Sequence, residues 1–164
     1  MVHLLISEII QSNRVATDQE IDRIIKHMAD APFNDHLIPV PIELRDQVYF
    51  GRRLGTRADS LTVHVLARVL ADRQWRAGTT PAEFCADVQS AILHPSARLI
   101  VYQRRSGYIA AILSENIVPT VRRGSRSLPL LFVVYSLERG SIISAYQASD
   151  MNQIAIPGDA LWLR

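Results

Sequence analysis

The sequence predicts an α+β fold in which N-terminal helices pack on a four- to five-stranded antiparallel β-meander. Capped segments with helical spacing lie before residue 95, and four apolar segments joined by glycine-containing links follow. Helices followed by a run of strands are typical of this class. With 164 residues, of which 48% are hydrophobic, the chain is long enough for one domain with one core. Its expected parts are an N-terminal helix with an irregular segment, a helical pair, the meander and a tail, spanning residues 1–59, 60–95, 97–148 and 149–164.

The first 31 residues contain a short apolar segment and one clear helix signal. Periodicity does not decide whether Val2–Ile10 is a strand or a helix. Thr17 and Glu20 form a capping box, in which the Thr hydroxyl accepts from a helical N–H and the Glu reaches back. Aliphatic side chains then follow at helical spacing, namely Ile21, Ile24, Ile25 and Met28. This helix should end before Pro32, and His27 on it is expected to be a solvated or boundary histidine.

Residues 31–59 are the least regular part of the sequence. Three prolines among residues 32–41 forbid a long helix there. Residues 37–44 have the pattern of an extended edge segment, and residues 46–55 that of a short strand or a loop. A basic cluster, Arg52, Arg53 and Arg57, suits either phosphate contact or simple solvation.

A helical pair is predicted next. Asp59 or Ser60 can cap a helix over residues 61–77, and Gly78 occupies the position of a C-terminal capping glycine. Thr80, Pro81 and Glu83 then start a second helix, whose expected buried face comprises Phe84, Val88, Ala91 and Ile92. His94 precedes a proline and should end this helix.

The meander is predicted from four segments, ARLIVYQ, YIAAIL, LPLLFVVYS and SIISAYQ, between residues 97 and 147. Ser106-Gly107 and residues 138–140 provide hairpin links. Because side chains alternate along a strand, Ile142, Ser144 and Tyr146 should share one face, and Ile143, Ala145 and Gln147 the other. In the tail, residues 152–156 (NQIAI) are compatible with a short strand, and residues 161–163 with docking on the core.

Charge, cysteine content and the length of apolar runs limit the classes of function that this protein can have. The net charge is +2 and the pI about 9.0, with Arg greatly outnumbering Lys, a pattern that suits phosphate contact but also arises from genome composition. The single cysteine, Cys85, excludes a disulfide framework and is expected to be a buried, inert thiol. No apolar run approaches the roughly 20 residues of a membrane span, and the first residues lack a signal-peptide pattern. We expect a soluble, cytoplasmic protein without metal or cofactor.

No phosphate-binding glycine loop, zinc-ligand spacing, GxSxG or HExxH motif is present. What the sequence offers is a set of His, Arg, Tyr and Ser side chains on one predicted helix and on or beside the sheet. These are His64, Arg68, Tyr102, Arg104, Arg105, Arg122, Arg123, Tyr135, Ser144 and Tyr146. Metal-free RNA cleavage needs residues of these types. Imidazole transfers protons near neutral pH, guanidinium stabilises the negative charge that grows on the phosphate, and phenols stack on bases.

Residues 61–148 resemble the barnase/EndoU/colicin/RelE-like superfamily of ribonuclease toxin domains. The shared features are a helix carrying HVLAR, a capped helix ending in His-Pro, and a meander of the form RLIVY…GYIAAIL…LFVVYSLERGSIISAYQA. Such domains occur at the tips of bacterial polymorphic and contact-dependent inhibition toxins, delivered by secretion systems, and in phage proteins. The resemblance implies helices packed on an antiparallel sheet whose open face carries the active site.

The resemblance also implies residue roles. His64 would be the general acid or base, Arg68 a phosphate or orienting contact, and Ser144 and Tyr146 substrate-positioning groups, with Tyr102 as a weaker candidate. Further substrate-binding residues would be Arg104, Arg122, Arg123 and Tyr135. The implied partners are an RNA substrate, such as tRNA, and an acidic immunity protein or antitoxin, with no membrane. Many relatives carry a second histidine where this chain has Val69.

Two functions follow from these features. The first is a metal-independent endoribonuclease that cleaves cellular RNA by attack of the ribose 2′-OH. The second is a non-catalytic module that binds RNA or a protein through the same sheet, which the absence of a second histidine favours. A nucleotide-dependent transferase is a weaker third alternative without a supporting motif.

Overall fold

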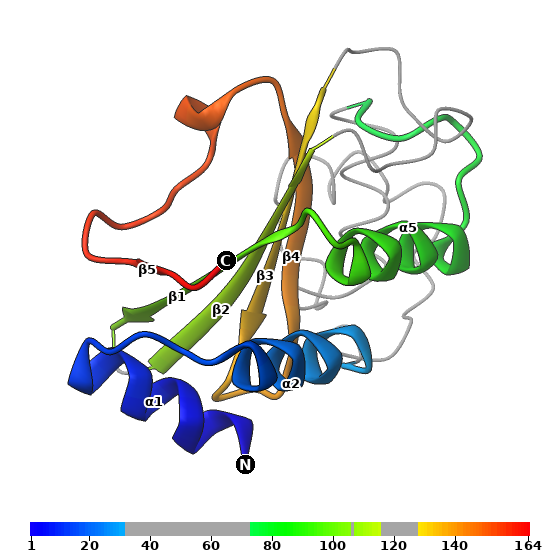
Figure 1. Ribbon diagram of the computed structural model, residues 1–164. Helices are drawn as coiled ribbons and strands as arrows, with labels where there is room; N and C mark the ends of the chain where they lie inside the picture. Colours follow the sequence, from blue (N-terminus) through cyan, green and yellow to red (C-terminus); the bar gives the residue numbers. More distant parts are fainter. Residues whose placement is uncertain (32–72, 106, 116–127) are drawn as a thin grey trace.

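The computed structural model describes residues 1–31, 73–105, 107–115 and 128–164 (Figure 1). Within these ranges the chain forms three α-helices and a five-stranded antiparallel sheet, so the predicted α+β class is confirmed. The helices lie together on one side of the sheet. No helix in the described ranges is long and apolar enough to cross a membrane.

The sheet is a meander with one added edge strand. Four strands follow one another in sequence and in space, namely β1 (Arg98–Arg104), β2 (Gly107–Glu115), β3 (Leu130–Ser136) and β4 (Ser141–Ala148). The two-residue strand β5 (Leu161–Trp162) pairs with the outer side of β1, which gives the order β4-β3-β2-β1-β5. The C-terminal segment therefore leads from one edge of the meander to the other.

Helical spacing and capping residues account for the three helices of the described ranges. The first segment, for which the sequence left strand and helix open, forms helix α1 (Val2–Ser12). Leu5, Ile6 and Ile9 recur at helical spacing and are buried. Helix α2 (Asp18–Ala29) and helix α5 (Pro81–Leu93) each start with a complete capping box. Their predicted buried faces are confirmed.

The helix predicted over residues 61–77 is wrong at its C-terminal end. Arg73 has φ 53°, a left-handed value incompatible with a continuing α-helix, and residues 73–77 are not helical. The side-chain oxygen of Gln74 instead accepts from the backbone N–H of Gln147 at 2.7 Å. This segment is thus bonded to β4, a long-range contact that local periodicity does not reveal. Residues 61–72 lie outside the described ranges.

The helix-facing side of the sheet carries the larger of two cores. Aliphatic side chains of α1, α2 and α5 pack on alternate residues of all four meander strands. Trp75 packs on Phe84 with ring centroids 4.6 Å apart, and its indole N–H donates to Asp87 Oδ2 at 3.0 Å. The polar atom of this large side chain is therefore satisfied although the residue is buried.

The opposite side of the sheet carries a second, smaller core. Ile100, Leu113 and Phe132 are buried on this side, and Ile154 and Ile156 of the C-terminal segment pack with them. The segment thus covers part of the face that the helices leave uncovered. Strands buried on both faces have nearly continuous apolar sequences, which explains the run LLFVVY in β3.

A β-bulge in β4 changes the predicted facing of its residues. Val134 pairs with Ser144, but Tyr135 pairs with Ile142, so Ile143 is the extra residue of the bulge. Ser144 and Tyr146 do share a face, as predicted. Ile142, however, lies with Ala145 in the helix-facing core, because the extra residue reverses the alternation. The prediction that Ile142 joins Ser144 and Tyr146 is therefore wrong.

The tail also differs from the prediction. Residues 152–156 form no strand; Met151–Gln153 is a short 3-10 helix capped by Asp150, whose carboxylate accepts from the Asn152 N–H at 2.8 Å. Leu161 and Leu163 pack on the core as expected. Trp162 between them is 44% exposed, because successive residues of β5 point to opposite faces.

Candidate functional site

Four of the predicted site residues lie on the sheet face opposite the helices. Tyr102 and Arg104 are on alternate positions of β1, and Tyr146 is on the same face of β4. Tyr102 is buried, and burial raises the pKa of its phenol. The guanidinium of Arg104, which lowers that pKa, and the phenol of Tyr146, which raises it, both lie close enough to interact electrostatically with Tyr102. We call Tyr102, Arg104, Ser144 and Tyr146 the phenol cluster.

The β4 members of the phenol cluster are more accessible than Tyr102. Ser144 and Tyr146 are half-buried. The ring of Tyr146 stands edge-on to Phe132, with centroids 5.7 Å apart, so the apolar part of the phenol is packed. Arg104 is exposed at the end of β1. The cluster therefore combines one buried phenol with an exposed cation and two half-buried hydroxyl groups.

Tyr135 is not part of this cluster. The register places it opposite Ala110 and Ile142, in the helix-facing core, whereas Ser144 and Tyr146 face the other side. Its hydroxyl lies 2.7 Å from His27 Nε2, and the two rings are edge-to-face at 5.4 Å. Burial raises the pKa of the phenol. Tyr135 thus anchors α2 to the sheet, and the prediction that it contacts substrate together with Ser144 and Tyr146 is not supported by this placement.

Several predicted site residues lie outside the described ranges. They are His64, Arg68, Arg122 and Arg123. The acid or base role of His64 and the phosphate role of the three arginines therefore stay predictions from the sequence.

The described histidines have other contacts. His94 ends α5, and its Nδ1 lies 2.7 Å from Ser96 Oγ and accepts the Ser96 backbone N–H at 3.2 Å. This Ser–His contact is local to an exposed turn. His3 lies edge-on to Tyr108, whose hydroxyl accepts from Gln11 at 3.0 Å; hydrogen bonds from Ser7 and Gln11 lower the pKa of that phenol. These contacts join α1 to β2, so they serve the fold.

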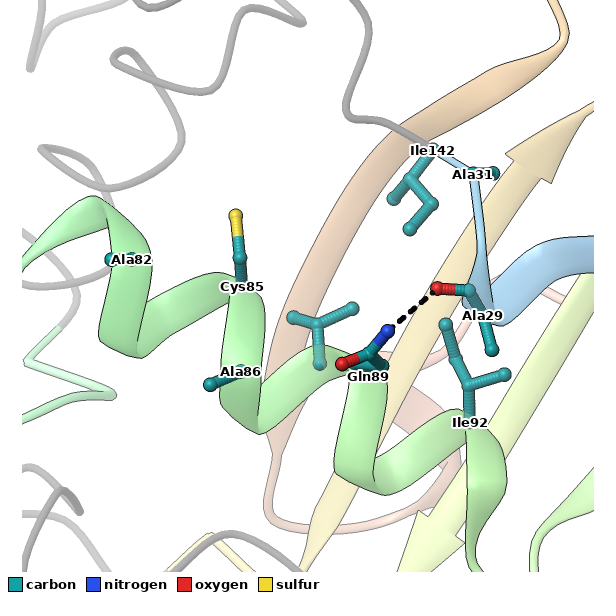
Figure 2. Close-up of a pocket in the computed structure, with 9 residues that line it drawn as sticks. Ala29, Ala31, Ala82, Cys85, Ala86, Gln89, Ile92 and Ile142 are labelled. Atoms are coloured by element: carbon teal, nitrogen blue, oxygen red, sulfur yellow. Dashed lines mark hydrogen bonds between the residues drawn. The ribbon is translucent and has the colours of Figure 1, made fainter.

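One pocket of about 440 Å³ lies between α2, α5 and the start of β4 (Figure 2). Its lining is mostly apolar, with Ala29, Ile92 and Ile142 around the half-buried Cys85. The Gln89 amide that borders it donates to the carbonyl of Ala29 at 3.1 Å. Burial raises the pKa of the Cys85 thiol, which keeps it protonated and makes it a poor nucleophile. The pocket offers apolar contact rather than acid–base chemistry.

Metal ligation is not supported by the described part of the chain, where no group of three His, Cys, Asp or Glu side chains converges. Comparison with known proteins gives no further guidance, because no family model, curated protein or solved structure matches this sequence.

One pair of residues was missed by the sequence analysis. Trp162 is exposed on β5, and the guanidinium carbon of Arg98 lies 5.6 Å from the centre of its ring. No motif marks this contact, because the two residues are far apart in sequence and meet only through the pairing of β5 with β1.

Proposed function

We propose that this protein is a metal-independent endoribonuclease of the toxin type, which cleaves tRNA or another cellular RNA by attack of the ribose 2′-OH on the adjacent phosphate. The observation that carries the proposal is the phenol cluster on the side of a helix-backed meander that the helices leave uncovered. This arrangement agrees with the architecture expected from the resemblance to barnase/EndoU/colicin/RelE-like domains.

The chemistry assigns different roles to the members of the cluster. A phenol whose pKa is raised stays protonated at neutral pH, so Tyr102 can donate a hydrogen bond but is a poor base. Arg104 supplies positive charge where charge grows on the phosphate oxygens. Ser144 and Tyr146 position the ribose or base. Proton transfer then requires an imidazole, and His64 is the residue we propose for it.

The decisive test is cleavage of total RNA in the presence of a chelator. Discrete fragments that end in 2′,3′-cyclic phosphates are expected from the wild-type protein. His64→Ala should lower the rate by about 10²- to 10⁴-fold, the usual contribution of a general acid or base. His94→Ala is the matched control, because the described hydrogen bonds of the His94 side chain reach only Ser96 in the same turn, and it should retain full activity. Full activity of His64→Ala would remove His64 from the mechanism.

A second candidate is a non-catalytic RNA-binding module on the same scaffold. Val69 in place of a second histidine and the modest net charge of +2 favour it. Such a protein would bind RNA with strongly salt-dependent affinity and yield no cleavage product.

We further propose that a nuclease of this kind acts in the cytoplasm and is held inactive by an acidic protein. The pI of about 9.0 and the exposed arginines beside the phenol cluster support an acidic partner. Inhibition of cleavage by such a partner, relieved by high salt, would test this point.

A further inference from the structure

The outer edge of the sheet presents an exposed tryptophan. Trp162 is 44% exposed, although large aromatic side chains are mostly buried in folded proteins. It pairs with Ile100 of β1, and paired residues of a sheet share a face. Ile100 belongs to the core opposite the helices. Trp162 therefore stands on the same sheet face as the phenol cluster.

Charged neighbours flank this ring on β1. Arg98 and Arg104 share its face by alternation from Ile100, and both are exposed. The Arg98 guanidinium lies over the Trp162 ring at 5.6 Å. The two arginines are six positions apart, which at about 3.3 Å per residue corresponds to roughly 20 Å along the strand. The Trp162 ring, on the neighbouring strand, thus lies under Arg98, and Arg104 lies farther along β1 at a distance that several nucleotides can span.

The C-terminus holds this ring in place. Leu163 N–H donates to the carbonyl of Leu99 at 2.8 Å, and Leu99 N–H donates to the carbonyl of Arg164 at 3.2 Å. The Arg164 side chain donates to the carbonyls of Ala97 and His94. The two residues after Trp162 are thereby bonded to the β1 region, and Leu161 before it pairs with Val101, so little ordering is needed when a ligand arrives.

We propose that Arg98, Trp162 and Arg104, the β1–β5 edge, bind single-stranded RNA next to the phenol cluster. An unpaired base stacks on the exposed part of the Trp162 ring, and the two guanidinium groups contact phosphates on either side. Stacking on an aromatic ring combined with backbone contacts by arginine is how proteins hold unpaired strands without reading sequence. This proposal rests on the proposed function, because it supplies the place where the RNA substrate of that site is held.

RNA fits this edge better than a protein partner does. A protein docking surface usually offers a larger apolar patch, whereas Leu161 and Leu163, the neighbours of Trp162, pack on the core. The exposed aromatic area is one ring, bordered by cations. Phosphates complement these cations, and a base complements the ring.

Tryptophan fluorescence gives a direct test. The chain has two tryptophans, and Trp75 is 1% exposed, so it serves as an internal reference. The probe is a 2′-O-methyl uridine hexamer, which cannot be cleaved because its 2′-oxygen is blocked. We expect the hexamer to quench the Trp162 emission, and quenching that persists in Trp162→Phe would assign the signal to Trp75 and overturn the proposal.

Affinity is then measured by anisotropy of a 5′-labelled hexamer. Trp162→Ala should weaken binding roughly 5- to 150-fold, the range for loss of one base stack. Arg98→Ala should reduce the slope of log K against log salt by about 0.7, and Arg98→Lys should keep that slope. Arg23→Ala removes an exposed arginine from α2, on the other side of the sheet, and should change neither quantity.

The same variants separate this proposal from the nuclease activity. Wild-type binding by Trp162→Ala would overturn the RNA-binding edge, whatever the cleavage assay shows. Trp162-dependent binding by a protein that yields no cyclic phosphate would support the edge and refute the nuclease. If the wild-type protein neither binds the hexamer nor cleaves RNA, both proposals fail, and a protein partner becomes the better explanation of the exposed ring.

Discussion

The two faces of the sheet differ in how their polar groups are satisfied. On the helix-facing side, Tyr135 is bonded to His27, and the Ser114 hydroxyl donates to the carbonyl of Ala91 of α5. On the opposite side, Tyr102 has no hydrogen bond from its hydroxyl to any described residue, and its polar neighbours lie toward the rim. The first face uses its polar groups to fix helices to strands. On the second face, no described hydrogen bond joins Tyr102 to a helix.

The largest expected effect is a loss of stability, which tests whether the side chains on both faces of the sheet are packed as a core. Phe84→Ala on α5 and Phe132→Ala on β3 should each lower the free energy of unfolding by about 3–5 kcal/mol, because both side chains are fully buried and each leaves a cavity. Urea unfolding measures both losses. Leu93→Ala is the control on the same helix, since Leu93 is 54% exposed, and should change stability by less than about 0.5 kcal/mol. A small loss for Phe132→Ala alone would mean that the second face is a loosely covered surface.

A smaller effect on stability should distinguish Tyr135 on the helix-facing side from Tyr102 on the opposite side. Tyr135→Phe removes the partner of His27 and should cost about 1 kcal/mol, the usual net value of one hydrogen bond. Tyr102→Phe should leave stability nearly unchanged and instead reduce RNA cleavage or binding. A double-mutant cycle of Tyr135→Phe with His27→Ala, followed by thermal or urea unfolding, measures the coupling directly. Equal costs for the two tyrosines would contradict the distinction between the faces.

The pH dependence of stability offers the finest test. In the helix layer, Glu20 accepts two hydrogen bonds from Arg14, at 2.8 and 3.0 Å, and one from the Thr17 N–H at 2.9 Å. These contacts, with Arg14 first, lower the pKa of Glu20 to about 2. A lowered pKa in the folded state gives stability that is present above the ordinary carboxyl pKa and is lost as the pH falls from about 4.5 toward 2.

Glu20→Gln should therefore flatten the decline of the melting temperature between pH 5 and pH 2. Glu115→Gln, at the exposed end of β2, should leave that decline as it is. Because the Arg14–Glu20 pair is only partly buried, the expected effect is small and should diminish in high salt. An unchanged acid limb in Glu20→Gln would show that the Arg14 contacts add no pH-dependent stability.

Local chemistry made most of the fold predictable. The capping boxes at Thr17 and Thr80 fixed the starts of α2 and α5, because each depends on residues three positions apart. The four meander strands were likewise predictable from apolar segments, because short glycine-containing links join the first to the second and the third to the fourth. Of the candidate site, the shared face of Ser144 and Tyr146 followed from simple alternation, and the structure adds Tyr102 and Arg104 to that face.

Other features needed the tertiary structure. The bulge at Ile143 depends on the register between β3 and β4, which the sequence of β4 alone does not contain. The partner of Tyr135 also could not be predicted. The face of Tyr135 follows from its strand, but its partner, His27, lies on a helix more than a hundred residues earlier.

Sequence by itself thus determined the α+β class, the helix starts and the strand segments, since each reflects contacts between residues near one another in the chain. Only the tertiary structure decided that β5 pairs with β1, that Trp162 meets Arg98, and that the C-terminal segment covers part of the second face. The physical reason is that strand pairing is a long-range choice. It is governed by which apolar surfaces can be buried together, and no local pattern encodes it.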